Sequence, residues 1–232
     1  MIGIIGAMRI EVDILIAMLS DSQRETISGR DYHSGRLCGQ DVVIVECGVG
    51  KVNAAMCAQT LILNYHPDLI VNTGVAGGLT QDLHIGDIAI ARDLVQHDVD
   101  TTAMGDPIGF VSTVNRVDFP CAEWAVQRIL EAVNTQDGLR GVLARIASGD
   151  QFISRRADKL RIIEQFQADA CEMEGAAIAQ VCWINGVDCA VIRAISDVMD
   201  GEHAMEFCQF CEMAAHNSSR VLMCFLENLG NK

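Results

Sequence analysis

The sequence predicts one α/β domain spanning residues 1–232, with helices flanking a twisted, mixed and mostly parallel β-sheet. The first observation is that short apolar runs, which suit buried strands, alternate with longer segments whose apolar residues recur every three or four positions, as in amphipathic helices. Such alternation is typical of strand–helix–strand units. The second observation is a length of 232 residues without a repeat, a low-complexity segment or a linker. This length suits one large domain better than two.

The first hundred residues contain four predicted strands, each a short run composed mostly of isoleucine, leucine, valine or alanine. These strands are residues 2–5, 42–45, 69–72 and 88–91. The first two are each followed by a segment in which apolar residues have helical spacing, and these predicted helices are residues 10–19 and 52–63. The third strand ends in a glycine-rich segment at 73–78.

The second half of the chain continues the alternation up to a long C-terminal helix. The predicted helices are residues 122–133, 157–166, 176–183 and 205–229, and the predicted extended segments are 142–147, 170–173 and 187–195. The run at 187–195 is almost entirely apolar, as expected for a strand covered on both faces. Residues 98–120 show no regular pattern and carry two of the three prolines. We therefore expect a long excursion from the sheet there.

The composition argues against several kinds of partner. The net charge is −14 and the lysines and arginines are not clustered. Nucleic acid is therefore not an expected partner, because phosphate backbones are bound by clustered cations. No apolar run reaches the ~20 residues of a membrane-spanning helix, so no membrane partner is expected. The N-terminal sequence Met-Ile-Gly-Ile-Ile-Gly lacks the basic start of a signal peptide. We therefore expect a cytoplasmic protein.

Ten cysteines are scattered through the chain, most of them among apolar residues of predicted strands and helices. This distribution fits small buried hydrophobic side chains in a reducing compartment. Cys208 and Cys211 form the one close pair in the sequence. They lie within an apolar helical run, without the second pair that a zinc site would need. A metal or redox role for this pair is the minor alternative, and no metal site is predicted.

Three acidic residues follow predicted strands at the places where ligands collect in α/β folds. These residues are Glu11, Glu174 and Asp197. In open α/β sheets, ligands bind beyond the carboxyl ends of the strands. Phe152 also follows a predicted strand, within the sequence SGDQFI at 148–153. The sequence thus predicts three carboxylates and one aromatic ring at one edge of the sheet.

Each of these residues also has an ordinary structural explanation. Glu11 suits the first turn of a helix, where carboxylates are favourable. Asp197 could cap a helix, and Phe152 could belong to the core. Taken together, however, the four residues favour a site. Two carboxyl groups in different environments can act as acid and base, as in the cleavage of a glycosidic bond. An aromatic ring can stack on a planar leaving group.

Five stretches, in order along nearly the whole chain, resemble a known family. They are GIIGAM at 3–8, NTGVAGG at 72–78, SGDQFI at 148–153, CEMEGAAIAQVC at 171–182 and RAISDV at 193–198. In these stretches the sequence is similar to the bacterial 5′-methylthioadenosine/S-adenosylhomocysteine nucleosidases of the purine nucleoside phosphorylase superfamily. The resemblance implies the α/β fold of the nucleoside phosphorylases and hydrolases.

The resemblance also implies a role for each acid. Glu11 matches the acid that positions and activates the attacking water, Glu174 the acid that binds the ribose hydroxyls, and Asp197 the acid that donates a proton toward purine N7. Glu172 is expected to support the structure. The other implied substrate-binding residues stack on adenine, support or contact the base, or line the ribose and the 5′ pocket: Met8, Val49, Val75, Phe152, Ile153, Met173, Ser196 and Phe207.

The chain departs from the family pattern in two places. The family usually has serine where this chain has Val75, so one polar contact near the ribose is missing. Residues 97–106 keep the family outline, with Met104 in place of an aromatic residue, but residues 107–124 do not match. In the family this part helps to build the 5′-alkylthio pocket, partly across a dimer interface. The 5′ substituent is therefore the least determined part of the substrate.

These residues predict a hydrolase that cleaves the N-glycosidic bond of 5′-modified adenosines, with water as the nucleophile. No metal or organic cofactor is expected, because the substrate carries its own leaving group. The resemblance and the apolar composition predict a homodimer. The alternatives are a nucleosidase with another 5′ specificity, such as the aminodeoxyfutalosine type, a purine nucleoside phosphorylase, and, least favoured, a non-catalytic nucleoside-binding protein.

Overall fold

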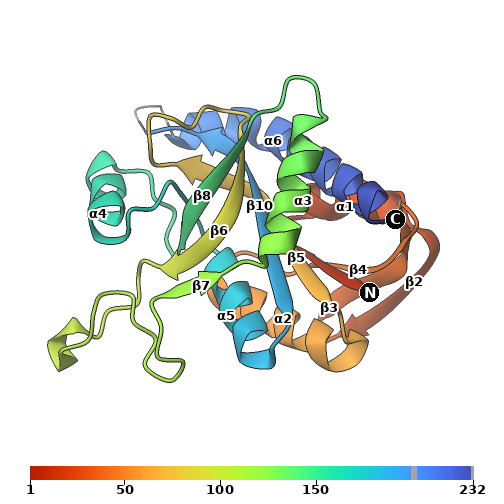
Figure 1. Cartoon of the computed structure of the whole chain (residues 1–232), viewed down its shortest axis with the longest axis horizontal. Coiled ribbons are helices and arrows are strands. Elements are labelled where there is room, and N and C mark those ends of the chain that lie inside the picture. The colour runs from red at the N-terminus through yellow and green to blue at the C-terminus, as the bar shows by residue number, and fades with distance from the viewer. Residues whose placement is uncertain (200–202, 231–232) are drawn as a thin grey trace.

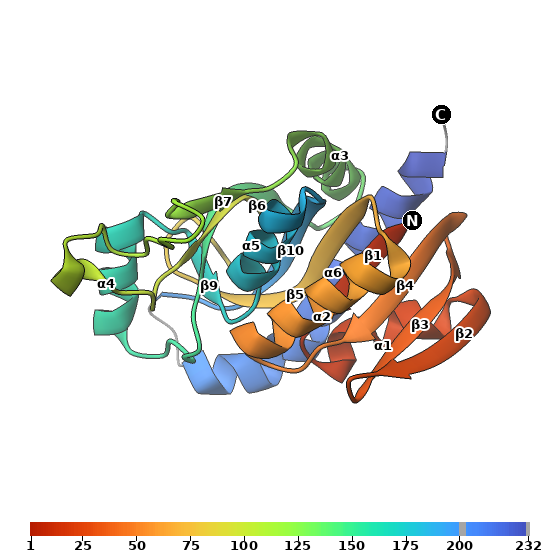
Figure 2. The ribbon, with the colours of Figure 1, turned by 90° about the horizontal axis from the view of Figure 1, so that it is seen from below.

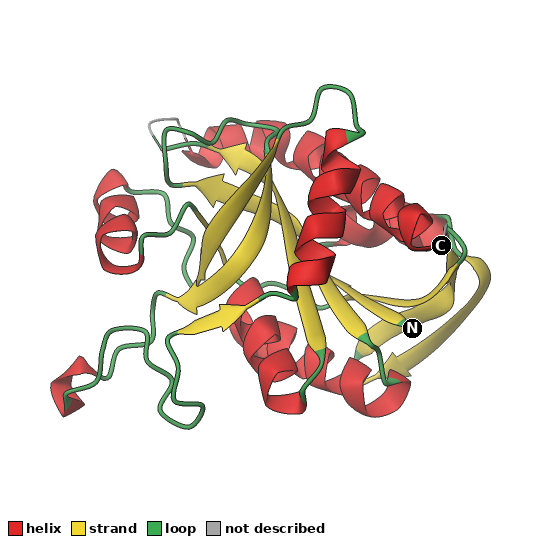
Figure 3. Cartoon of the chain, in the orientation of Figure 1, coloured by secondary structure: helices red, strands yellow, loops and turns green. Residues whose placement is uncertain are grey.

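The structure, a computed structural model, describes residues 1–199 and 203–230 and contains one continuous β-sheet flanked by helices (Figures 1 and 3). The strands are β1 (Ile2–Gly6), β2 (Ser20–Ile27), β3 (Arg30–Leu37), β4 (Gln40–Glu46), β5 (Leu69–Gly78), β6 (Ile88–Gln96), β7 (Asp118–Pro120), β8 (Gly141–Ser148), β9 (Ala170–Glu172) and β10 (Asp188–Asp197). The helices are α1 (Arg9–Ala17), α2 (Lys51–Tyr65), α3 (Glu123–Asn134), α4 (Arg156–Phe166), α5 (Gly175–Asn185) and α6 (His203–Gly230), with a 3₁₀ turn η1 (Thr102–Met104).

The sheet consists of an open wing and a closed ring of strands. The wing runs in the order β2-β3-β4-β1-β5. Strand β5 also pairs with both β9 and β10, and the pairings β9–β8, β8–β6 and β6–β10 complete a ring of five strands. Strand β5 therefore belongs to both parts and is buried along almost its whole length.

The predicted α/β class with a mixed sheet is confirmed. The pairings β1–β4, β1–β5, β5–β10, β6–β8 and β8–β9 are parallel. The pairings β2–β3, β3–β4, β5–β9, β6–β7 and β6–β10 are antiparallel. Antiparallel pairing thus has a larger share than the predicted mostly parallel arrangement, because three strands, β2, β3 and β7, were not predicted and because the ring closes through β6–β10.

Two of the three unpredicted strands, β2 and β3, form a polar hairpin at the sheet edge. Strand β2 has the sequence SDSQRETI and is exposed at seven of its eight positions. Its residues have no apolar run to signal a strand, and the ladder to β3 alone defines it. The glycine-rich segment at 73–78 was also expected to follow a strand, whereas it continues β5, because its backbone pairs with β10 as far as Gly77.

Helices cover both faces of the sheet. Helix α6 packs against α1 and α3 on one side, and α2 packs against α5 on the other (Figures 1 and 2). Helix α4 lies beyond the end of the ring, next to the irregular segment that includes η1. None of the helices within the described residues is long and apolar enough to cross a membrane.

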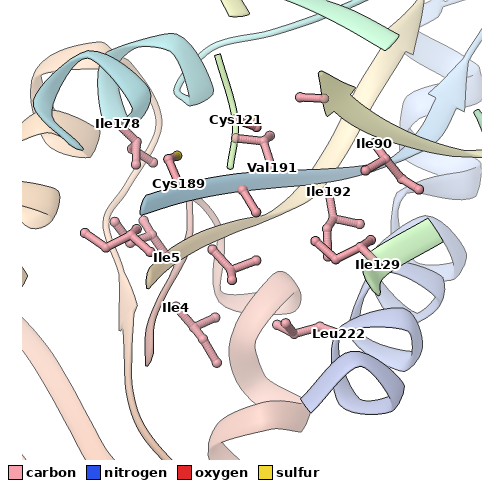
Figure 4. Close-up of a cluster of buried hydrophobic side chains, with 14 of the residues drawn as sticks. Ile4, Ile5, Ile90, Cys121, Ile129, Ile178, Cys189, Val191, Ile192 and Leu222 are labelled. Atoms are coloured by element: carbon pink, nitrogen blue, oxygen red, sulfur yellow. The ribbon is translucent and has the colours of Figure 1, made fainter. Parts of the chain in front are cut away.

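The core lies on either side of β1 and β10 (Figure 4). Ile178 of α5 approaches from one side, and Ile129 of α3 and Leu222 of α6 approach from the other, while Val191 and Ile192 of β10 lie between them. Each of these side chains is fully buried, and burial of a side chain of this size contributes about 1.5–3 kcal/mol. Coverage on both faces explains why β10 reads as a continuous apolar run.

The cysteines that the structure describes are free thiols, and six of the nine are buried fully or almost fully inside the core: Cys47, Cys57, Cys121, Cys171, Cys182 and Cys189. This agrees with the interpretation of cysteine as a small hydrophobic residue. The side chain of Cys208 lies outside the described residues. Among the side chains that are described, no group of three histidine, cysteine or acidic residues is arranged to hold a metal ion.

Candidate active site

A cavity of about 440 Å³ opens at the carboxyl ends of β1, β5 and β10. Its size and mostly apolar lining with a few polar groups are typical of small-molecule sites. Every residue that the sequence analysis selected lies on this cavity: Met8, Glu11, Val49, Val75, Phe152, Ile153, Met173, Glu174, Ser196, Asp197 and Phe207. The structure thus brings together side chains that are almost 200 residues apart in the sequence.

Glu11 is held by three backbone N–H groups. One carboxylate oxygen accepts hydrogen bonds from Ala7 (2.7 Å) and Met8 (2.9 Å), and the other accepts one from Val75 (3.1 Å). Burial raises the pKa of Glu11, while Arg193 and the N–H groups act against that rise. The capping explanation is partly right, because Glu11 completes a capping box at the start of α1. Yet the same carboxylate reaches across to β5 and faces the cavity.

Glu174 occupies the N-terminal cap position of α5 and is buried. Its Oε1 accepts a hydrogen bond of 2.8 Å from the backbone N–H of Gly50, and its Oε2 lies 3.7 Å from Nη2 of Arg193. Burial, followed by the neighbouring carboxylate of Glu172, raises the pKa of Glu174 to about 7. The protonated form of Glu174 is therefore favoured more than that of an exposed glutamate.

The loop that carries Gly50 is tied to two other loops of the site. The backbone N–H of Lys51 donates to Asp150 (2.8 Å), and the Lys51 ammonium pairs with Asp98 (2.6 Å). Asp98 in turn accepts a hydrogen bond from the backbone N–H of Asp150 (2.8 Å). These contacts link the ends of β4, β6 and β8, and they set the position of the N–H group that Glu174 binds.

Arg193 and Glu172 form the buried support of this part of the site. The guanidinium of Arg193 pairs with Glu172 and donates to Asn72 (2.5 Å). Glu172 also accepts hydrogen bonds from the backbone N–H groups of Glu174 (3.0 Å) and Gly175 (2.8 Å). These contacts fit the supporting role expected of Glu172. The sequence analysis missed Arg193, because it lies within an apolar strand where nothing local indicates a charged partner.

Asp197 ends β10 at an irregularity of the ladder with β5. Ile195 pairs with Ala76 and Asp197 pairs with Gly77, so Ser196 is an extra residue. Such a bulge changes the direction of the side chains that follow it. Ser196 donates to Asp197 Oδ1 (3.2 Å). The helix-cap explanation for Asp197 does not hold, since α6 begins at His203, six residues later.

Gly77 lies opposite Asp197, and the Asp197 carboxyl group is so close to it that a larger residue would not fit there. A Cβ atom at Gly77 would lie 3.0 Å from Oδ2 and 3.1 Å from Oδ1 of Asp197. The carboxyl group therefore packs directly on the backbone of β5. Its Oδ2 also lies 3.1 Å from the ammonium of Lys159, a buried residue of α4. Lys159 is the second cation that the sequence analysis missed.

The rim of the cavity is aromatic and apolar. The rings of Phe152 and Phe207 meet edge to face, with their centroids 5.6 Å apart. Phe152 is half exposed, as is Val49, whereas Ile153 is buried below them. Phe152 therefore does not belong to the core, and its ring is accessible to a flat ligand. Val75 is buried beside Glu11, and its side chain gives this part of the lining an apolar surface.

The segment expected to help build the 5′ pocket lies elsewhere in the single chain. No described residue between 98 and 124 lines the cavity. The segment around η1 projects from the body of the molecule (Figure 1), and Met104 is 76% exposed. In the single chain, this segment therefore does not cover the half-exposed rim of the cavity at Val49 and Phe152.

Comparison with known proteins agrees with this geometry. A family model described as the phosphorylase superfamily matches residues 1–227. The chain is 39% identical over 229 residues to 5′-methylthioadenosine/S-adenosylhomocysteine nucleosidases of Shewanella sp. (strain MR-7) and Shewanella oneidensis, covering 98% of this chain and 97% of each relative.

Solved structures give the same picture. The nucleosidase of Neisseria meningitidis in complex with methylthio-immucillin-A superposes with a TM-score of 0.93 at 31% identity, covering 98% of both chains. The nucleosidase of Colwellia psychrerythraea in complex with adenine has a TM-score of 0.92 at 38% identity, covering 98% of this chain and 95% of that one. A futalosine hydrolase of Helicobacter pylori has a TM-score of 0.91 at 35% identity, covering 98% and 97%.

Proposed function

This chain belongs to the phosphorylase superfamily, and from that premise we propose how its cavity cleaves a nucleoside. The chain is an N-glycosidic hydrolase of 5′-modified adenosines, 5′-methylthioadenosine and S-adenosylhomocysteine, and it releases adenine and the thioribose product. The observation that carries the assignment of roles is the meeting of Glu11, Glu174 and Asp197 on one cavity.

The substrate lies with its sugar between the two glutamates and its base near Asp197. Glu174 binds the ribose hydroxyls, because its carboxylate is held at the cavity wall by Gly50 and Arg193. Phe152 stacks on adenine from the rim, and the backbone of Ile153 contacts the purine edge. The remaining side chains surround the ribose, the base-binding loop and the 5′ substituent: Met8, Val49, Val75, Met173, Ser196 and Phe207.

At the purine end, Asp197 acts as the general acid. Adenine leaves poorly as an anion, so a proton on N7 lowers the barrier. The carboxyl proton of Asp197 moves to N7 while the electron pair of the C1′–N9 bond moves onto the purine. Positive charge then builds on the ribose ring, as in other glycosidic cleavages. The bulge at Ser196 and the packing on Gly77 keep the carboxyl group in one orientation for this transfer.

At the sugar end, Glu11 acts as the general base. A water molecule attacks C1′ with its oxygen and gives a proton to the Glu11 carboxylate. The raised pKa of Glu11 makes this carboxylate a stronger base than an exposed glutamate. Asp197 has then lost one proton and Glu11 has gained one, and exchange with solvent restores both groups. The net reaction consumes one nucleoside and one water molecule.

Water is favoured over phosphate as the nucleophile by the charges of the lining. The described lining residues include three glutamates and one aspartate but no lysine or arginine. Phosphate sites are typically built from arginine, lysine and hydroxyl donors. Val75 also lacks the hydroxyl group of the serine that the family usually has at this position beside Glu11. A dianionic phosphate would therefore meet repulsion where water does not.

A different 5′ specificity is the second candidate. It is favoured by the similarity to a futalosine hydrolase over nearly the whole chain and by the departure of residues 107–124 from the nucleosidase pattern. The purine and ribose parts of the site are the same in both cases. The two candidates differ only in the group that the 5′ pocket accepts.

We further propose that residues 1–232 form one cytoplasmic nucleosidase domain that acts as a homodimer. Apolar side chains on α2 and α5 are exposed in the single chain: Val52 is 80%, Leu63 64% and Ile184 59% exposed. Apolar surface of this kind is typical of obligate interfaces. In the dimer, the segment 98–124 of the partner covers the rim of the cavity. Light scattering at micromolar concentration tests this, and the mass of a single chain would contradict it.

The activity is tested by product analysis. The protein is incubated with 5′-methylthioadenosine, S-adenosylhomocysteine and aminodeoxyfutalosine, each with and without phosphate, and the sugar product is identified. Free thioribose from the first two substrates, at a rate independent of phosphate, is the expected result. A sugar 1-phosphate would identify a phosphorylase, turnover of aminodeoxyfutalosine alone would identify the second candidate, and binding without any product would identify a binding protein.

A further inference from the structure

A lysine is buried completely on the apolar face of α4. The buried residues of this helix are Lys159, Ile162 and Phe166, whose spacing of three and four places them on one face. Lysine is almost never fully buried unless it is paired, and an isoleucine or leucine would suit this packing position. Lys159 nevertheless has no exposed surface. Its presence at this position calls for an explanation in terms of its partners.

Among the described contacts of the Lys159 ammonium are one carboxylate and two backbone carbonyl groups. The ammonium lies 3.1 Å from Oδ2 of Asp197, and it donates to the carbonyl oxygens of Gly78 (3.2 Å) and Val198 (3.1 Å). These carbonyls belong to the end of β5 and to the residue after β10. The ammonium therefore joins three chain segments at the point where the acid of the site is positioned.

The geometry separates the ammonium from the substrate. Asp197 lines the cavity, whereas Lys159 does not. The two carboxyl oxygens of Asp197 are engaged separately, Oδ2 by Lys159 and Oδ1 by the hydroxyl of Ser196. Gly77 packs against the same carboxyl group. Lys159 thus contacts Asp197 from outside the described lining of the cavity, and the described contact through which it can act on a ligand there is the one with Asp197.

We propose that Lys159 is a positioning residue for Asp197, which orients the carboxyl group toward the purine and stabilises the negative charge that it gains on proton transfer. The inference rests on the proposed hydrolase function. When the Asp197 proton moves to N7, the carboxyl group becomes a carboxylate in buried surroundings. An ammonium already in place needs no rearrangement at that moment, and preorganised charges of this kind are where enzymes gain most of their electrostatic stabilisation.

The test is a cycle of four proteins: wild type, Lys159→Met, Asp197→Asn and the double variant. Single-turnover rates are measured with 5′-methylthioadenosine and enzyme in excess, and folded sites are counted by binding of an unreactive adenosine analogue. In the wild-type background, Lys159→Met is expected to lower the rate by about 10²-fold. In the Asp197→Asn background, the same substitution is expected to change the rate by less than about threefold, because there is no carboxylate left to stabilise.

Two further variants keep the result independent of folding. Lys159→Gln retains N–H donors for the two carbonyls without the charge, and its rate is expected to fall almost as far as that of Lys159→Met. Arg161→Met removes another cation from the same helix. The guanidinium of Arg161 donates to Gln165 (3.3 Å), and the rate of this variant is expected to match that of wild type.

The outcomes distinguish a Lys159 that acts through Asp197 from a Lys159 that acts independently of it. An equal loss of rate from Lys159→Met in both backgrounds would show that Lys159 does not act through Asp197 and would overturn the inference. A wild-type rate in folded Lys159→Gln would overturn it as well. If the wild-type protein itself released no adenine, the proposed function would fail first, and the inference would fall with it.

Discussion

The two ends of the cavity differ in how many buried carboxyl groups surround each buried cation. At the sugar end, one guanidinium, that of Arg193, lies among three carboxylates, those of Glu11, Glu172 and Glu174. At the purine end, the described ion pair joins the ammonium of Lys159 to the carboxyl group of Asp197. The sugar end therefore has an excess of negative charge, whereas the described charges of the purine end are balanced.

This difference matches the role proposed for each end. At the sugar end, burial raises the pKa of Glu11, and burial together with the carboxylate of Glu172 raises the pKa of Glu174. The raised pKa values make these carboxylates stronger bases and suit the proposed stabilisation of positive charge on the ribose. At the purine end, a fixed carboxyl group with a balancing cation suits the release of a proton. Under the proposed roles, a carboxyl group serves as base or as acid according to the charges around it.

The largest effect is expected from Asp197→Asn, which removes the transferable proton at the purine end but keeps the shape of the side chain. Turnover is expected to fall by about 10²–10⁴-fold, the usual contribution of general acid catalysis. The affinity for an unreactive adenosine analogue is expected to change much less. Asp87→Asn is a matched control, because Asp87 is a buried aspartate paired with Arg140 (2.8 Å) away from the cavity. Near-normal turnover in folded Asp197→Asn protein would exclude Asp197 from the mechanism.

The next largest effect is expected from Arg193→Met, which leaves the carboxylates of the sugar end without their shared cation. Removing one partner of a buried ion pair typically lowers the free energy of unfolding by about 3–5 kcal/mol, and denaturant unfolding measures this loss. Arg145→Met is the matched control, because Arg145 also pairs with a carboxylate, that of Asp93 (2.7 Å), but at a partly exposed position. An equal loss in both variants would contradict the claim that burial and shared charge distinguish the sugar end.

A smaller effect concerns the pH dependence of stability. The folded-state pKa of Glu174, about 7, lies above its ordinary value of 4.5. The folded protein therefore binds this proton more tightly, and the associated stability is present below about pH 4.5 and is lost as the pH rises through about 7. Relative to wild type, Glu174→Gln is expected to gain about 1–3 kcal/mol of unfolding free energy over this range. Parallel pH profiles for the two proteins would refute the assignment.

The smallest effect is expected from Val75→Ser, which adds a hydroxyl group at the sugar end without changing its charge. The substitution is expected to be tolerated, with turnover close to wild type and without phosphate dependence, because a lone hydroxyl without cationic partners binds phosphate weakly. Turnover is measured at increasing phosphate concentration, with wild type as the reference. A steep rise with phosphate and formation of a sugar 1-phosphate would show that Val75 alone prevents phosphorolysis.

The wing and the ring of the sheet show which strands and pairings can be predicted from local sequence patterns. Strands β1, β4 and β10 were predicted because their apolar runs are covered on both faces. Strand β2 was not, because its polar residues are defined as a strand only by pairing with β3. Closure of the ring through β6 and β10 likewise depends on the pairing of segments about a hundred residues apart, for which no local pattern exists.

The sequence by itself determined the class of fold and selected three acids that line one cavity. Apolar periodicity distinguishes strands from helices, and the rule that ligands collect at strand ends selects Glu11, Glu174 and Asp197 without any coordinates. Only the tertiary structure decided which cation serves which acid. Arg193 lies in an apolar strand and Lys159 on the buried face of a helix, so neither is marked locally as part of a site. Their partners are set by register and packing, because an ion pair depends on distance in space and not on distance along the chain.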